Sequence, residues 1–393
     1  MEKILIIGGG GTGGALAYDL AMRGFGVTLV EKGSLLSGTS GRHHGLLHSG
    51  ARYVMHDLET ARECYAENQI LRRLAPQAIE PNDGLFVALD DEDMAFQAPF
   101  VRSCRLAGIP IRVLGAAQAL RLEPDLNPGI KGAVQVPDGV MDAWRLPLHF
   151  FAAAHANGTR IMTFHQVEKL ILRAGCVTGA QVQDLRSGRS ETFSADLVVN
   201  AAGAWSGQIG ALAGVDIPVR PGPGVMVSVS GRLTNMVINR LQPAGEGDIL
   251  VPQRNLTVIG TTAWLADDPD QVFPPVDHVQ RMLDMGARLI PEVKQTKVHA
   301  AWCASRPLLQ ADGERDPMRI SRGFACIDHK NRDGLEGFVS VVGGKATTLR
   351  AMAEETADLI CSKTGRTITC RTAQSPLPLY RKFLQTHASG CRR

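Results

Sequence analysis

The chain has 393 residues, of which 44% are hydrophobic and 21% are charged, and its formal net charge is +3. This composition is typical of a soluble globular protein, and the balanced charge gives no reason to expect binding to nucleic acid. The length favours two packed units over one small domain.

Eight cysteines are scattered along the chain, and no two of them have C-x-x-C spacing. The sequence therefore predicts no bound metal and no iron–sulfur cluster, and we expect buried thiols in a reducing compartment. No apolar run reaches the roughly 18 residues that a membrane span requires, and the early first strand leaves no room for a signal peptide. We expect a cytoplasmic protein, and peripheral attachment at the inner face of the cell membrane stays open.

The first thirty residues follow the order strand, glycine turn, helix, strand. Lys3 to Ile7 is an apolar run, "GGGGTGG" follows as a turn, Ala15 to Arg23 is amphipathic, and Val27 to Val30 is again apolar. This order is the context in which G-x-G-x-x-G binds a dinucleotide. The sequence therefore predicts a Rossmann unit at the start of the chain.

Each glycine of this motif has a separate task. Gly8 permits the tight turn, Gly10 lets a pyrophosphate approach the backbone, and Gly13 lets the helix pack on the strand. The start of the helix offers free N–H groups to the phosphates. Glu31 ends the second strand, where its carboxylate can accept hydrogen bonds from the ribose hydroxyls. A carboxylate there disfavours NADP, so FAD and NAD remain.

The next stretch, "SGTSGRHHGLLHSGARYV", mixes histidines and arginines with glycines. The glycines allow the backbone to lie close to a cofactor. We expect Thr39 and Ser40 to contact the pyrophosphate or the ribityl hydroxyls. His48, Arg52 and Tyr53 then become candidates for the substrate side of the cofactor.

The middle of the chain favours FAD over NAD. Leu197 to Asn200 reads as a buried strand that turns through "AAGAWS" into a helix led by Ser206. Before it, residues 158–196 read as a strand and a meander with a hairpin signal at residues 187–188. This arrangement resembles the glutathione-reductase-like FAD fold, in which Val167 lies over the adenine and Gly203 near the flavin or the pyrophosphate.

The rear of the chain repeats the pattern of strand, glycine turn and helix. Phe338 to Val342 is the expected strand, Gly343 and Gly344 form the turn, and a helix led by Thr347 runs to Cys361. An N-terminal helix end aimed at a flavin would stabilise negative charge on its pyrimidine ring. The nucleotide-binding domain is therefore predicted to be discontinuous.

The stretch "GRHHGLLHSGARYVMHDLETARECYAENQILRRLAP" resembles the catalytic A subunits of anaerobic glycerol-3-phosphate dehydrogenases. These are FAD enzymes of the D-amino-acid-oxidase-like superfamily. The similarity continues through "EPNDGLFVAL", "VPDGVMDAWRL", "VVNAAGAW", "VINRLQPAGEGDILVP", "SRPLL", "ISRGFACIDH" and "GGKATTLRAMAEE", and it covers roughly residues 1–376. So many motifs in order are specific for the family and less specific for the substrate.

The resemblance implies an α/β fold with an α+β second domain. We expect a glutathione-reductase-like, FAD-binding Rossmann domain interleaved with a substrate domain built on an antiparallel sheet. The runs "VMVSV", "DILVP" and "LTVIGTT" suggest that sheet, and "VDHVQRMLDMGARLIP" a helix that covers it. The expected limits are 1–82, 144–215 and 331–371 for the FAD domain, 83–143 and 216–330 for the substrate domain, and 372–393 for a basic tail.

The resemblance also implies a reaction, in which sn-glycerol 3-phosphate gives a hydride from C2 to flavin N5 and becomes dihydroxyacetone phosphate. The catalytic candidates are His48 as base, Lys345 and Arg306. The substrate-binding candidates are Arg52, Tyr53, Arg306, Arg322, Thr261 and Thr262, because arginine forks suit a phosphate dianion. The FAD-binding candidates are Gly8, Gly10, Gly11, Thr12, Gly13, Glu31, Lys32, Thr39, Ser40, His44, Gly45, Val167, Ala202, Gly203, Trp205, Gly343, Gly344, Lys345, Ala346 and Thr347.

Three departures from the family pattern put the substrate in question. Pro223 stands where lysine is usual, Leu349 where tyrosine is common, and Ala143 follows Asp142 in place of proline. Another polyol phosphate, a 2-hydroxy acid such as 2-hydroxyglutarate, or an amine are the alternative substrates. Several converging arginines would favour a phosphate, and a single one a carboxylate. A flavin-bound sensor or assembly subunit without turnover is the alternative from another class.

Relatives in this family carry a C-terminal, cysteine-rich module that resembles an iron–sulfur-binding domain. Residues 372–393 contain one cysteine, Cys391. We therefore expect the electrons to leave the flavin by another route, to a quinone, a partner subunit or oxygen. The oligomeric state is left open by the sequence.

Overall fold

A six-stranded sheet forms the nucleotide-binding half of the computed structural model, which describes residues 1–243, 245–309 and 323–381. The strand order is β19-β20-β13-β1-β2-β9, and the neighbours are parallel except for β19 and β20. The bounds are β1 Lys3–Ile7, β2 Gly26–Glu31, β9 Arg160–Thr163, β13 Leu197–Asn200, β19 Phe324–Asp328 and β20 Phe338–Gly343.

Strand β1 contributes side chains to two hydrophobic cores, one on each face of the sheet. Ile4 and Ile6 join the core that contains the helices, whereas Leu5 and Ile7 join the core of the meander. Burial on both faces explains why the strand is an unbroken apolar run. The covering elements are α1 Gly11–Met22, α5 Arg145–Ala156 and α9 Leu349–Lys363 on one face, and β10 His165–Arg173, β11 Cys176–Asp184, β12 Ser190–Ser194 and α6 Ser206–Leu212 on the other.

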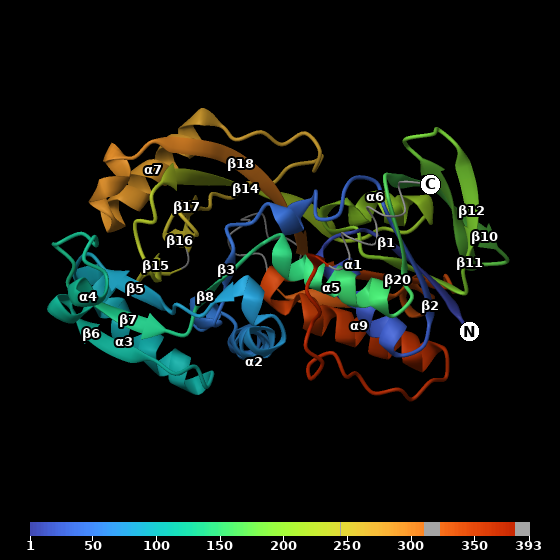
Figure 1. Ribbon diagram of the computed structural model, residues 1–393, viewed down its shortest axis with the longest axis horizontal. Coiled ribbons are helices and arrows are strands. Elements are labelled where there is room, and N and C mark those ends of the chain that lie inside the picture. Colours follow the sequence, from blue (N-terminus) through green and yellow to red (C-terminus); the bar gives the residue numbers. More distant parts are fainter. Residues whose placement is uncertain (244, 310–322, 382–393) are drawn as a thin grey trace.

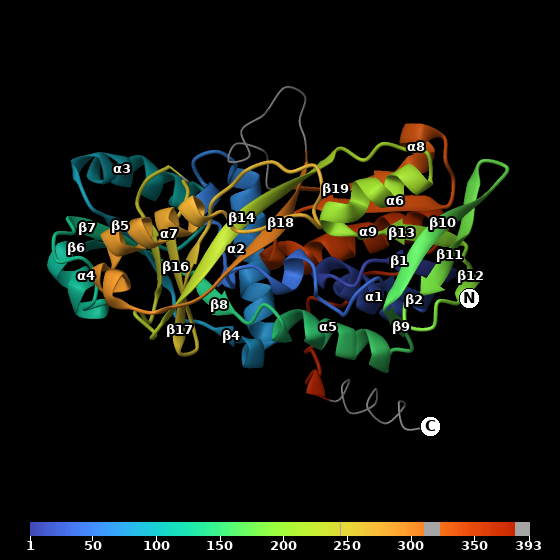
Figure 2. The ribbon, with the colours of Figure 1, turned by 90° about the horizontal axis from the view of Figure 1, so that it is seen from above.

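An eight-stranded sheet forms the other half, which lies beside the first along the long axis of the molecule (Figures 1 and 2). Its order is β18-β14-β17-β16-β15-β5-β7-β6, and its neighbours are antiparallel except for β15 and β5. Helix α7 packs on it through Met282 and Leu289. The bounds are β5 Gly84–Ala88, β6 Arg112–Gly115, β7 Gly132–Val136, β14 Val219–Ser230, β15 Val237–Arg240, β16 Ile249–Gln253, β17 Leu256–Gly260, β18 Val298–Leu309, α3 Asp91–Leu106, α4 Ala116–Leu122 and α7 Val276–Leu289.

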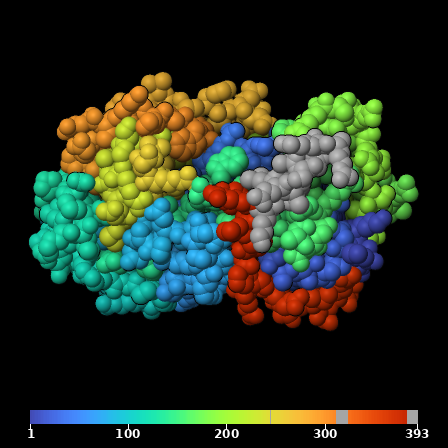
Figure 3. All heavy atoms as spheres, viewed as in Figure 1, coloured from blue at the N-terminus to red at the C-terminus, as the bar shows by residue number. Residues whose placement is uncertain are grey.

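A small sheet and helix α2 lie between the two halves (Figure 1). The elements are β3 Leu46–Leu47, β4 Ile79–Glu80, β8 Gly139–Met141 and α2 Leu58–Leu74. The described end of the chain crosses the surface beside α2 and α5, where the amide of Leu377 donates to the carbonyl of Leu74 (Figure 3). Within the described ranges, no helix combines the length and apolar character that crossing a membrane requires.

Most of the predicted elements that frame the nucleotide site are present. Strands β1 and β13 have the predicted bounds. Helix α1 starts at Gly11, four residues before our prediction, because the glycines of the motif themselves form its first turn. The rear helix α9 starts at Leu349 after the 3₁₀ turn Ala346–Thr348.

One domain limit needs correction. Strand β19 falls within residues 216–330, which we assigned to the substrate domain, but it pairs with β20 in the six-stranded sheet. Its residues Phe324 and Cys326 pack against the core beneath α1 and α9. The nucleotide-binding half therefore includes β19, which lies before the predicted limit of 331. The other domain limits stay predictions. The described helix α8 His329–Asp333 follows β19 directly.

Candidate active site

A cavity of about 1400 Å³ lies between the two halves. Typical pockets for one drug-sized ligand measure roughly 300–1,000 Å³, so this one has room for a dinucleotide and a second molecule. Its wall combines the β1–α1 turn, residues within 37–57, Ile249 of β16, residues 303–308 of β18 and the turn after β20. The wall includes these predicted site residues: Gly8, Gly10, Gly11, Thr12, Glu31, Lys32, Thr39, Ser40, His44, His48, Arg52, Tyr53, Val167, Ala202, Gly203, Trp205, Thr261, Arg306, Gly343, Gly344, Lys345, Ala346 and Thr347.

The nucleotide end of the cavity is built from close backbone approaches. A Cβ on Gly8, whose φ is +120°, would lie 2.5 Å from the carbonyl oxygen of Ala201, so only glycine fits between β1 and β13. The carboxylate of Glu31 accepts hydrogen bonds from the amides of Gly9 and Gly33, both at 2.7 Å. These bonds hold the carboxylate still at the cavity edge, where its remaining lone pairs can accept from ribose hydroxyls.

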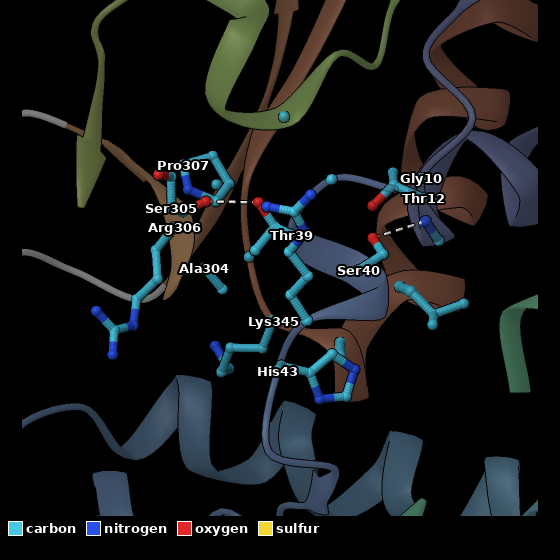
Figure 4. A pocket seen from close by; sticks show the side chains of 18 of the residues that line it. Gly10, Thr12, Thr39, Ser40, His43, Ala304, Ser305, Arg306, Pro307 and Lys345 are labelled. Atoms are coloured by element: carbon cyan, nitrogen blue, oxygen red, sulfur yellow. Dashed lines mark hydrogen bonds between the residues drawn. The ribbon is translucent and has the colours of Figure 1, made fainter. Parts of the chain in front are cut away.

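The start of α1 points into the cavity beside residues 39 and 40. The amide of Gly11 donates to the hydroxyl of Ser40 at 2.9 Å, and the hydroxyl of Thr39 donates to the carbonyl of Ser305 on β18 (Figure 4). Figure 4 shows Ser40 and Gly10 on one side of the cavity and Arg306 on the other. This loop therefore ties the phosphate-binding turn to the substrate sheet.

Two predicted cofactor residues and one predicted substrate residue do not line the cavity. A Cβ on Gly13 would lie 2.0 Å from the carbonyl oxygen of Gly8, so Gly13 serves the packing of α1 on β1. Gly45 faces Gln253 and the carbonyl of Met141. The side chain of Thr262 is buried, and its hydroxyl accepts from the amide of Val225 and bonds His278 at 3.1 Å.

Three histidines and a tyrosine form a cluster at the other end. The rings of His43 and His44 lie 6.4 Å apart, those of His44 and His48 6.2 Å, and those of His48 and Tyr53 5.3 Å. The Nδ1 atom of His43 accepts a hydrogen bond from the amide of Gly45. The Nδ1 atom of His44 accepts one from the amide of Leu46. An accepting Nδ1 means a neutral imidazole.

Burial and neighbouring cations keep these imidazoles neutral. Burial lowers the pKa of His43 to about 4, and burial with the charges of Arg306 and Arg52 lowers the pKa of His44 to about 3. Burial, with Arg52 and Lys345 nearby, also holds the pKa of His48 well below its ordinary value. At neutral pH each ring can accept a proton.

The backbone of His48 is held from three sides. Its amide donates to the hydroxyl of Thr347 at 3.1 Å, and its carbonyl accepts from the buried amide group of Asn68 at 3.2 Å. The next amide, of Ser49, donates to the carboxylate of Asp138 at 2.7 Å. Sequence reasoning missed Asn68 and Asp138, because neither belongs to a local motif.

Arg306 lies on β18 with its guanidinium against β14 and the end of β17. Its Nη1 donates to the carbonyls of Gly222 and Pro223 at 3.1 and 3.2 Å, and its Nη2 donates to the carbonyl of Thr262 at 3.2 Å and to the Thr261 hydroxyl. Pro223, a departure from the family pattern, thus holds the arginine through its carbonyl. The other departures, Leu349 and Ala143, line the cavity itself. The predicted residue Arg322 lies outside the described residues.

Lys345 follows the glycine turn after β20. Gly343 and Gly344 both have left-handed backbone, with φ of +84° and +78°, which swings the chain into the cavity. The Lys345 ammonium lies 5.1 Å from the centre of the Tyr53 ring. The first turn before α9 therefore brings a cation and free helical N–H groups to the histidine cluster.

A loop from the substrate half closes the nucleotide end, which the sequence did not indicate. Asp270 accepts from the indole N–H of Trp205 at 2.9 Å and pairs with Lys32 at 3.0 Å. The Lys32 ammonium also lies 4.7 Å from the centre of the Trp205 ring. Within the described chain, no group of three or more His, Cys, Asp or Glu side chains is placed to hold a metal ion.

A Rossmann turn at one end of a long cavity, with cations and neutral imidazoles at the other, defines the class of flavin-dependent oxidoreductases. The family model described as "FAD dependent oxidoreductase" (DAO) matches residues 3–359, and the chain belongs to this family. FAD is accordingly its cofactor.

Two relatives and one solved structure illustrate the similarity. The chain is 41% identical over 379 residues to the A-type polypeptide of the anaerobic glycerol-3-phosphate dehydrogenase of Escherichia coli K12, an alignment that covers 96% of this chain and 70% of that relative. It is 42% identical to the corresponding A1-type polypeptide of Haloferax volcanii, with coverage of 96% and 66%. It superimposes on the FAD-complexed glycerol-3-phosphate dehydrogenase of Bacillus halodurans with a TM-score of 0.76 and 25% identity, covering 100% of this chain and 72% of that one.

The residues on the cavity wall fit FAD. Gly203, with φ +57°, has open space where a Cβ would stand, and Gly11 and Thr12 at the start of α1 line the cavity beside the hydroxyl of Ser40. Glu31, Val167 and the turn at Gly343 line the same continuous space. The adenosine, pyrophosphate and flavin parts thus each meet the kind of wall that they require.

Proposed function

We propose that the protein oxidises sn-glycerol 3-phosphate to dihydroxyacetone phosphate. Bound FAD supplies the acceptor for the hydride that leaves C2 of the substrate. The proposal depends on one observation: His48, which is held neutral, lines the same cavity as three cationic side chains, Arg52, Arg306 and Lys345. The names of the relatives and of the solved structure point to the same substrate.

His48 is proposed as the base that accepts the proton of the C2 hydroxyl. A base must be unprotonated at working pH, and burial beside Arg52 and Lys345 keeps the pKa of His48 low enough for that. The hydrogen bonds of its backbone with Thr347 and Asn68 fix the position of the main chain that carries the ring. The hydroxyl proton then goes to the imidazole as the hydride leaves C2.

The cations are proposed to bind the phosphate. Two arginines and a lysine on one wall suit a dianion better than a single carboxylate, which one arginine fork would satisfy. Both Arg52 and Arg306 lie close enough to His44 to lower the pKa of that ring, so they act on one region. This favours the phosphate over a 2-hydroxy acid or an amine.

We also propose that the final electron acceptor is a quinone or an electron-accepting partner protein at the inner face of the membrane. The support is that the relatives at 41% and 42% identity are named as subunits, which are parts of an assembly.

Anaerobic reduction of the flavin tests the proposed substrate. Purified holoenzyme is mixed with sn-glycerol 3-phosphate, 2-hydroxyglutarate or an amine, and bleaching of the flavin band is followed by stopped flow. We expect rapid bleaching by the phosphate alone, with Arg306→Ala weakening it at least tenfold. Arg220→Ala is the matched control, because Arg220 lies on β14 outside the cavity and pairs with exposed Asp267. Bleaching by another substrate, and none by the phosphate, would reject the proposal.

A further inference from the structure

Arg52 is held at one corner of its guanidinium. Its Nη2 donates to the carboxylate of Asp248 at 2.6 Å and to the carbonyl of Gly245 at 2.9 Å. The Asp248 side chain is 0% exposed and that of Arg52 is 11% exposed. Among the described residues, these are the only hydrogen bonds of the guanidinium.

The two bonds at Nη2 leave the N–H groups of Nε and Nη1 for a ligand. Nε carries one N–H and Nη1 carries two, and each of these can donate a charge-assisted hydrogen bond to a phosphate oxygen. Arg52 lines the cavity, so a ligand bound there can reach these N–H groups. A guanidinium fixed at one corner also loses less rotational freedom when the ligand binds.

Asp248 also shapes the backbone that holds Arg52. Its second carboxylate oxygen accepts from the amide of Gly245 at 3.2 Å, and the carbonyl of that same glycine accepts from Arg52. One carboxylate thus serves both the arginine and the turn beside it. Only an acceptor-only group can do this, because an amide side chain in its place would present an N–H to one of the two donors.

We propose that Asp248 is a positioning residue for phosphate recognition, which holds Arg52 through Nη2 and so orients its remaining N–H groups, on Nε and Nη1, towards the phosphate of the substrate. This proposal rests on the proposed function. It predicts that Asp248 acts on substrate affinity and leaves the chemical step at C2 unchanged. Two effects of removing its charge oppose each other: the arginine loses its orientation, and the phosphate gains an uncompensated cation. We expect orientation to dominate, because a guanidinium that can turn no longer directs its Nε and Nη1 N–H groups at the phosphate.

The test is Asp248→Asn in the holoenzyme, with anaerobic stopped-flow reduction over a range of sn-glycerol 3-phosphate concentrations. We expect Kd to rise at least tenfold while the limiting rate of flavin reduction changes less than twofold. Reduction by glycerol, which has no phosphate, stays at the wild-type efficiency. Titration of the oxidised enzyme with dihydroxyacetone phosphate, read from the flavin spectrum, should show the same loss of affinity without turnover.

Asp93→Asn is the matched control. Asp93 is a buried carboxylate of the same half that pairs with Arg240 at 2.9 Å, away from the cavity. It should lower the melting temperature with no change in Kd. If Asp248→Asn folds poorly, the comparison of Arg52→Gln with Asp248→Asn/Arg52→Gln decides, since the second change should then add nothing to Kd.

Three results of these experiments would overturn the proposal. Tighter phosphate binding by Asp248→Asn would mean that the carboxylate only attenuates charge, and unchanged Kd would mean a structural role; either overturns the proposal. An equal loss for glycerol and for the phosphate substrate would also overturn it. If the wild-type flavin is not reduced by sn-glycerol 3-phosphate at all, the proposed function fails first, and the product titration alone still tests the phosphate site.

Discussion

Replacing Asn68 with alanine should destabilise the fold and disable His48 together. Asn68 is fully buried on α2, and its Nδ2 lies 3.2 Å from the carbonyls of Leu47, His48 and Pro137, while its Oδ1 accepts from Arg72 at 2.8 Å. Two hydrogens on Nδ2 allow two full neutral bonds, of about 1 kcal/mol each, and the arginine bond adds about 1.5–3 kcal/mol. The expected loss is therefore about 4 kcal/mol of unfolding free energy.

The measurement combines urea unfolding with anaerobic flavin reduction. We expect the limiting reduction rate to fall about ten- to hundredfold, because the loop that carries His48 shifts by a fraction of an ångström to an ångström. Asn157→Ala is the control: Asn157 is exposed at the end of α5 and makes one side-chain bond, so its loss should change stability by less than about 0.5 kcal/mol. A destabilised Asn68→Ala enzyme that still reduces its flavin at the wild-type rate would show that Asn68 does not position His48.

Three further predictions follow from the same cavity. His48→Gln should lower the limiting rate of flavin reduction at least a hundredfold with little change in Kd, and an equal loss in affinity and rate would contradict its role as base. Asp270→Asn should release FAD at least tenfold faster, read from free-flavin fluorescence, because the bonds to Trp205 and Lys32 weaken; the exposed pair of Asp91 offers the control Asp91→Asn. Because of His44, the free energy of unfolding should fall as the pH falls from about 6.5 towards about 3. In that pH range His44 binds a proton in the unfolded chain and not in the folded chain, which lowers the stability by up to about 1.4 kcal/mol per pH unit. His44→Asn should flatten that slope in urea unfolding.

The nucleotide end could be predicted from sequence because its determinants are local. Gly8, Gly10 and Glu31 lie within 24 residues of one another, and the strand–turn–helix context fixes their geometry. The prediction for Thr261 and Thr262 shows the limit of such reasoning. Both stand in one tripeptide, yet one lines the cavity and the other is buried under β14, because the wall they face comes from a distant strand.

The acidic residues that bond the site residues could not be predicted either, because they too come from distant parts of the chain. Asp248 is 196 residues from Arg52, Asp138 is 89 residues from Ser49, and Asp270 is 238 residues from Lys32. Each is an ordinary acidic residue in its own neighbourhood, and only the pairing of the two halves gives it a task. Local pattern therefore finds the groups that touch a cofactor, whereas the residues that aim those groups require the fold.

The cations that we propose to bind the phosphate also keep the proposed base unprotonated. Burial lowers the pKa of His48 and of His44, and the charges of Arg52 and Lys345 add to this for His48, as those of Arg52 and Arg306 do for His44. A dianion bound among them would offset that charge, so the pKa of His48 rises when substrate is present. The imidazole is thus unprotonated when substrate arrives and a stronger base once substrate is bound. A substrate without the phosphate would meet the weaker base, which gives the cavity a second means of discrimination beyond affinity.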